Sequence, residues 1–211
     1  MRRSVGHGFT AAIVGRAPSE VLSEAVDSRV AWAAFIGLVA VERLVELALS
    51  RRHAAWSMAQ GGVEHGQGHY PVMVVLHVGL LAGCLLEPWL ADRPFLPWLG
   101  WPALAVALAC QAMRWWCVAS LGSHWSTRVI TVPGMRLVAA GPYRWLRHPN
   151  YAAVVAEGIA LPLVHTAWMT AGAFTLANLM LLRERVRVED AALRECAARA
   201  GVTRAARGRA A

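Results

Sequence analysis

The chain has 211 residues, of which 57% are hydrophobic, and its mean hydropathy is +0.41. This length suggests one domain, and the apolar content exceeds that of a typical soluble domain, so an integral membrane protein is the leading class. The net charge of +8 comes from 21 arginines and no lysine. The arginines gather at the ends of apolar runs and in the tail, where membrane proteins carry their cations. That placement argues against nucleic-acid binding.

Residues 1 to about 28 are predicted to form a flexible or surface-lying leader, and residues 29–211 one membrane domain. The N-terminal stretch FTAAIVG is at the short limit for a signal-peptide core, and Arg16 interrupts it before a cleavage site. The four cysteines form no CxxC pair and have no histidine at zinc-ligand spacing. No metal site is predicted.

Three apolar segments in the first half, about 30–49, 71–91 and 95–120, are long enough to span a bilayer core of about 20 residues. The first contains Glu42 and Glu46, which share one helix face. Charges at membrane depth face protein or a wet cavity, but the helix could equally leave the bilayer near Glu42. The sequence leaves both alternatives open.

The first two of these segments are separated by GGVEHGQGHY, residues 61–70, with His65 and His69 four residues apart. That spacing is typical of a helical metal pair, but the glycines disfavour a helix and no third ligand is evident. A flexible loop between helices is predicted here.

The last apolar run follows Tyr151 and is 31 residues long, which is more than one span needs. Pro162 and the pair His165-Thr166 near its middle predict two helices joined by a tight turn. The fold class is therefore an all-α membrane bundle of about five transmembrane helices with a C-terminal helical hairpin. From Arg183 onward, the charged sequence predicts a helix that continues out of the bilayer.

The polar stretch 123–150 is the longest non-apolar segment within the body of the chain, and it ends in GPYRWLRHPNY, residues 141–151. The hairpin follows, and then RVRVED, residues 185–190, and AAL. This ordered arrangement resembles the isoprenylcysteine carboxyl methyltransferase family, integral membrane enzymes that use S-adenosylmethionine. The resemblance covers residues 114 to 195 best and is strongest to small bacterial members.

The resemblance implies a role for each matching residue. Arg185 would be the catalytic residue that faces the acceptor, and Glu189, one turn later on the same helix face, would bind the cofactor. A guanidinium can orient an anionic oxygen, while a carboxylate can bind the positively charged amino group of the cofactor. Asn150 is also a plausible helix cap. The cofactor-binding part would be about 121–200, with contacts from Met135, Arg136, Leu137, Val138, Tyr143, His148, Pro149, Asn150, Tyr151 and Glu189.

Several other polar residues are left with two interpretations. Arg144 and Arg147 are typical of interfacial anchors, and this is favoured over a direct role for Arg144. Glu157 either completes the site or pairs with an arginine such as Arg114. Arg128 lies in the polar loop, where the resemblance is loose, and no role is assigned to it.

The favoured function is O-methylation of a lipophilic acceptor, an alkylpyrone or alkylresorcinol hydroxyl, at the membrane interface. Carboxyl methylation of an isoprenylcysteine is the alternative, followed by phospholipid N-methylation. A non-catalytic scaffold or transporter gives no reason for the two motifs to flank a hairpin. The expected partners are the small-molecule acceptor and membrane lipids, and the oligomeric state is left open. The arginine-rich ends predict a catalytic face on the cytoplasmic side, in bacteria that of the inner membrane.

Overall fold

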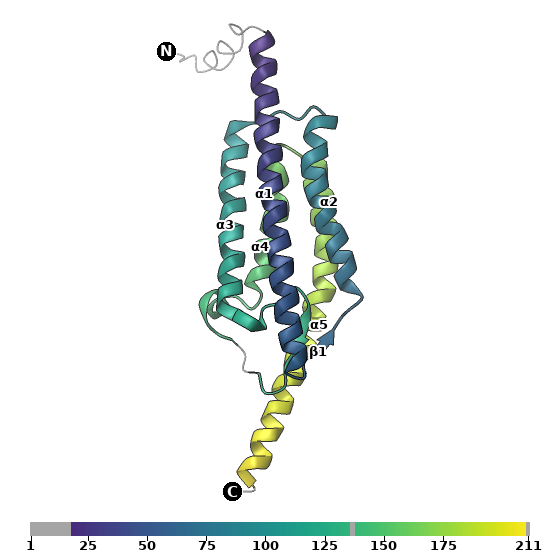
Figure 1. Ribbon diagram of the computed structural model, residues 1–211, viewed down its shortest axis with the longest axis vertical. Coiled ribbons are helices and arrows are strands. Elements are labelled where there is room, and N and C mark those ends of the chain that lie inside the picture. Colours follow the sequence, from purple (N-terminus) through teal and green to yellow (C-terminus); the bar gives the residue numbers. More distant parts are fainter. Residues whose placement is uncertain (1–17, 136–137, 210–211) are drawn as a thin grey trace, which may run out of the picture.

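The computed structural model describes residues 18–135 and 138–209, and five long helices run along one axis in this part of the chain (Figure 1). A small antiparallel sheet and two short 3-10 helices lie at one end of the bundle. The elements in chain order are α1 (Pro18–Ala59), β1 (Val63–His65), α2 (His69–Leu90), α3 (Pro97–Leu121), η1 (Gly122–His124), β2 (Val129–Thr131), η2 (Gly141–Arg144), α4 (Pro149–Leu163) and α5 (Trp168–Arg209).

The two central apolar segments form helices close to their predicted bounds. Both α2 and α3 are long and apolar enough to cross a membrane, and they are the two helices of the described chain that meet this criterion. Helix α1 runs from Pro18 to Ala59, so it is longer than predicted at both ends. Its start lies inside the segment assigned to a leader. Residues 1–17 of that leader lie outside the described residues.

The predicted hairpin is confirmed. Helix α4 ends at Leu163, one residue after Pro162, and α5 begins at Trp168. Thr166 has a positive φ of 52° in the turn, and its hydroxyl donates to the carbonyl of Pro94 at 2.7 Å. The α5 helix then runs without a break to Arg209, as the charged continuation predicted.

The apolar core joins helices from both halves of the chain. Ile36 of α1 and Leu161 of α4 are almost completely buried, together with Leu80 of α2 and Phe174 of α5. The indole of Trp32 donates to the Cys84 carbonyl at 2.7 Å, which ties α1 to α2. This packing fixes the relative positions of the helices that carry the polar motifs.

Charged side chains meet in the interior between α1, α3 and α4. Arg114 donates to both oxygens of Glu46, at 3.1 and 2.5 Å, while Arg43 donates to Glu46 at 2.5 Å and to Glu157 at 2.6 Å. We call Arg43, Glu46, Arg114 and Glu157 the buried ion cluster. The α1 carboxylates face protein, with Glu42 accepting from Gln111 at 3.1 Å, and Glu157 pairs with arginines.

The glycine-rich segment after α1 is not the loop that the sequence predicts. Its residues Val63–His65 form β1, which pairs antiparallel with β2, with His65 opposite Val129. His69 begins α2, so the two histidines belong to different elements. A strand of three residues is too short for an alternation of polar and apolar residues to be recognised in the sequence. In the structure, the two strands satisfy each other's backbone hydrogen-bonding groups.

The end of α1, the starts of α2 and α4, and the end of α3 all lie at the same end of the bundle (Figure 1). The small sheet and both 3-10 helices lie there too, and α5 passes through it before extending beyond. The polar motifs therefore gather at one end of the bundle.

Candidate active site

The segment that leads into α4 is held tightly against α3. Gly141 has a φ of +57°, and a Cβ at this position would lie 2.1 Å from the Ser120 hydroxyl oxygen, so a glycine is required here. The Tyr143 hydroxyl is hydrogen-bonded to the Cys117 thiol of α3. Burial raises the pKa of Tyr143 above its usual range, so the side chain remains a neutral phenol.

The start of α4 differs from the prediction by two residues. His148 occupies the N-cap position and the buried Pro149 is the first helical residue, so Asn150 lies inside the first turn and does not cap the helix. The reason is that proline suits the first helical position, where its missing N–H is not needed. The side-chain oxygen of Asn150 is buried and has no hydrogen-bond partner among the described residues. An acceptor atom in that position suits a ligand that donates a hydrogen bond.

Tyr151 links the two motifs across the hairpin. Its hydroxyl accepts from Arg185 Nε at 2.9 Å and donates to the Glu189 carboxylate in a short hydrogen bond. The His148 ring stacks on the Tyr151 ring with centroids 5.4 Å apart, and His148 Nε2 lies 3.1 Å from the Asp190 carboxylate. We call His148, Tyr151, Arg185 and Glu189 the site cluster.

Arg185 is the electrostatic centre of this arrangement. Its side chain is buried, and it donates to the Thr127 carbonyl as well as to Tyr151, while Nη1 lies 3.3 Å from the Met73 sulfur. None of the described carboxylates forms an ion pair with it, although Glu189 is one turn away. A buried cation with only neutral partners is costly, and an anionic ligand would compensate for it.

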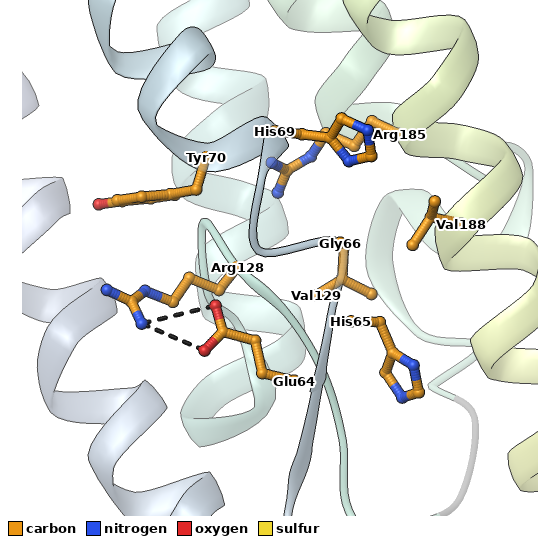
Figure 2. Close-up of a pocket in the computed structure, with 9 residues that line it drawn as sticks. All are labelled: Glu64, His65, Gly66, His69, Tyr70, Arg128, Val129, Arg185 and Val188. Atoms are coloured by element: carbon orange, nitrogen blue, oxygen red, sulfur yellow. Dashed lines mark hydrogen bonds and ion pairs between the residues drawn. The ribbon is translucent and has the colours of Figure 1, made fainter.

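A cavity of about 260 Å³ adjoins the site cluster at Arg185 (Figure 2). At its rim, Arg128 Nη1 lies 3.2 Å from Glu64, and the Arg128 guanidinium lies over the Tyr70 ring at 4.9 Å. The lining comes from β1, the start of α2, the stretch at β2 and α5: Glu64, His65, Gly66, His69, Tyr70, Arg128, Val129, Arg185 and Val188.

Comparison with known proteins agrees with the motif arrangement. The model of the isoprenylcysteine carboxyl methyltransferase (ICMT) family matches residues 103–195, which include α4, η2 and the site cluster. An uncharacterized protein of Bacillus subtilis, YpbQ, is 38% identical over 161 residues, 76% of this chain and 95% of that protein. The chain belongs to the ICMT family.

Two further proteins are similar to this chain at lower identity. An uncharacterized protein of Haemophilus influenzae is 24% identical over 72% of this chain and 88% of its own. A solved structure of the eukaryotic intramembrane Ras methyltransferase ICMT is 24% identical, with a TM-score of 0.48, over 58% of this chain. The match covers 45% of that protein, so this chain spans less than half of its length. The ICMT family is one of integral membrane methyltransferases, and this chain is a membrane methyltransferase.

The structure brings four of the eleven predicted site residues together in the site cluster: His148, Tyr151, Arg185 and Glu189. Tyr143 lies near enough to Tyr151 and Glu189 for their charges to raise its pKa. Their roles stay predictions, as does that of Pro149.

The predicted adenosine-binding segment is described only in part. The Met135 N–H donates to the Val132 carbonyl at 3.1 Å and closes the turn after β2, and Val138 lies farther along the same connection. Among the contacts of the described residues, none joins Met135 or Val138 to the site cluster. Arg136 and Leu137 lie outside the described residues.

Sequence reasoning missed the residues that contact Arg185 from outside the two motifs. Met73 and Thr127 contact its guanidinium, yet neither has a side chain that marks a site in a sequence. Arg144 and Arg147, by contrast, are exposed, and Arg144 stacks on Trp145, which fits their interpretation as anchors.

Proposed function

We propose that the protein is an S-adenosylmethionine-dependent O-methyltransferase that acts at the membrane interface on a lipophilic acceptor with an acidic hydroxyl, of the alkylpyrone or alkylresorcinol type. The observation that carries this proposal is the buried Arg185 guanidinium without a carboxylate partner in the described chain, one helical turn from Glu189. One face of α5 thus offers a cation for the acceptor and an anion for the cofactor.

The residues present fit the cofactor. When bound, S-adenosylmethionine supplies an electrophilic methyl group on a positively charged sulfur. Its ammonium group suits the partly exposed Glu189 carboxylate and the unpartnered oxygen of Asn150. The neutral Tyr143 and the stacked pair His148 and Tyr151 supply aromatic surface for the rest of the molecule. The backbone of residues 135–138 stays the predicted contact for the adenosine end, and Arg136 and Leu137 of this segment lie outside the described residues.

The acceptor side favours an anionic oxygen. Arg185 is fixed by Tyr151 and the Thr127 carbonyl, so its guanidinium is held in one orientation for an oxyanion. An acidic enol can be held there as an anion by Arg185, so for that acceptor a dedicated base is not needed. Carboxyl methylation of an isoprenylcysteine is the second candidate, because a carboxylate would satisfy Arg185 equally well. The same guanidinium disfavours a phospholipid amine, which brings no negative charge to it.

We propose that the site end of the bundle faces the cytoplasm. The exposed arginines Arg51, Arg52, Arg144 and Arg147 belong to this end, and positive charges flank the cytoplasmic ends of membrane helices. Cysteine labelling in intact cells tests this orientation, with Trp145→Cys expected to be protected and Asp92→Cys to be labelled. Equal labelling of the two positions would contradict it.

The first experiment is calorimetric titration of purified protein with S-adenosylmethionine, wild type beside Glu189→Ala. We expect the wild type to bind and Glu189→Ala to bind about 10 to 100 times more weakly, because a charge-assisted hydrogen bond is lost. Glu184→Ala is the matched control, since Glu184 lies on the same helix and pairs with the exposed Arg187 at 3.2 Å. Absence of binding by the wild type would refute the cofactor assignment, and equal binding by Glu189→Ala would refute the role of Glu189.

A further inference from the structure

The cavity beside Arg185 is built largely from residues that precede the part of the chain matched by the family model. Glu64, His65 and Gly66 come from β1 and its exit, and His69 and Tyr70 from the start of α2. The β1–β2 pairing brings this segment to Arg128, and α5 closes the other side through Arg185 and Val188 (Figure 2).

The cavity wall carries more positive than negative charge. Its lining contains two arginines, Arg128 and Arg185, and one carboxylate, Glu64, which Arg128 already engages. His69 adds two ring nitrogens that have no hydrogen-bond partner among the described residues. His65 differs, because its Nε2 lies 3.0 Å from the Thr131 hydroxyl. The wall therefore presents cationic and donor groups in excess of the acceptors that could satisfy them.

Shape limits what the cavity can hold. Gly66 has a φ of +65°, and a Cβ there would lie 3.0 Å from His69 Nδ1 and 3.1 Å from Val188, so the wall is backbone at this position. The cavity is open, and its empty space of about 260 Å³ includes part of the surrounding solvent. A long tail would lie outside, along α2, where Val72 and Val75 are exposed.

We propose that this cavity is the head-group site of the acceptor and that it binds an anionic, oxygen-bearing head. Arg185 holds the oxygen that is methylated, and His69 and Arg128 bind further oxygens of the same head. Tyr70 keeps the Arg128 guanidinium in place by stacking, and Glu64 tempers its charge. This inference rests on the proposed function, and it adds acceptor-recognising residues that lie outside the motifs of α4 and α5.

The test measures two affinities of the same detergent-purified protein by calorimetry. Binding of a long-chain hydroxy-alkylpyrone, measured without cofactor, tests the head-group site, and binding of S-adenosylmethionine tests the proposed function. We expect Arg128→Gln and His69→Gln each to weaken pyrone binding about tenfold, as loss of a hydrogen bond to a charged group implies. Neither variant should change the affinity for S-adenosylmethionine.

Glu64→Gln separates recognition from a structural role. If Arg128 recognises an anion, removal of the Glu64 carboxylate from the cavity wall strengthens pyrone binding, by about threefold for a partly exposed charge. If the Arg128–Glu64 pair only holds the β1–β2 hairpin, Glu64→Gln and Arg128→Gln weaken binding alike, and the inference is wrong. Arg187→Gln, on an exposed arginine of α5, is the control and should leave both affinities unchanged.

Two probes distinguish the possible sources of the anionic head. An S-prenylcysteine with a free carboxylate replaces the alkylpyrone in a parallel titration, and the methyl ether of the pyrone serves as the neutral analogue. The head-group site predicts that the ether binds at least about tenfold more weakly than the ionised pyrone. Equal binding of the ether, or no binding of either anionic probe by the wild type, would overturn the inference even if S-adenosylmethionine binds.

Discussion

Two regions of this molecule bury arginines, but the arginines have charged partners in one region and neutral partners in the other. In the buried ion cluster, Arg114 meets Glu46 through two hydrogen bonds and Arg43 bridges Glu46 and Glu157. In the site cluster, Arg185 is equally buried but contacts a hydroxyl, a carbonyl and a thioether. The comparison indicates that the charges of the buried ion cluster are paired within the protein, where they connect α1, α3 and α4. The charge of Arg185 is paired only when an anion is bound.

Removal of Arg114 from the buried ion cluster should have the largest effect, and this effect is on stability. Arg114→Met removes two of the three arginine hydrogen bonds to the Glu46 carboxylate in the interior, so we expect the free energy of unfolding to fall by about 3 to 5 kcal/mol. Denaturant or thermal unfolding in detergent measures it. Changing both partners, Arg114→Met with Glu46→Met, should restore much of the loss, because no unpaired charge remains. Equal stability of Arg114→Met and the wild type would contradict the structural role of the buried ion cluster.

The matching change at the site should affect activity instead of stability. Arg185→Met removes a buried charge that has no carboxylate partner in the described chain, so we expect unchanged or higher unfolding stability. Methyl transfer should fall by about 10² to 10³, the usual effect of losing a donor to a developing or bound oxyanion. Arg185→Lys keeps the charge without the planar fork and should retain part of the activity. A stability loss as large as that of Arg114→Met would assign Arg185 a structural role.

The same contrast explains how far the sequence could be interpreted alone. Hydropathy and length are local properties, so α2, α3 and the α4–α5 hairpin were predictable within a few residues. The spacing of Arg185 and Glu189 fixed one helix face, and this held. The ion-pair partner of each buried charge was not predictable, because Arg43 and Glu157 are 114 positions apart and meet only through helix packing.

The errors have equally local causes. The strands β1 and β2 are three residues each and leave no periodic signal, so a paired segment was interpreted as a loop. The predicted cap at Asn150 was wrong because Pro149 begins the helix two residues earlier than that cap implies. The roles of the cofactor-binding residues remain predictions until ligand binding is measured.

The smallest expected effect concerns the hydroxyl that separates the two charges of the site. Tyr151→Phe keeps the ring that stacks on His148 but removes the group that accepts from Arg185 and donates to Glu189. Because one hydrogen bond is worth about 1 kcal/mol net, and 1.4 kcal/mol is tenfold in rate, kcat/KM should fall about tenfold. Combined with Glu189→Gln, the losses should not add, since both variants break the same link. Fully additive losses would mean that Tyr151 positions Arg185 alone, and that the acceptor and cofactor sides of α5 are set independently.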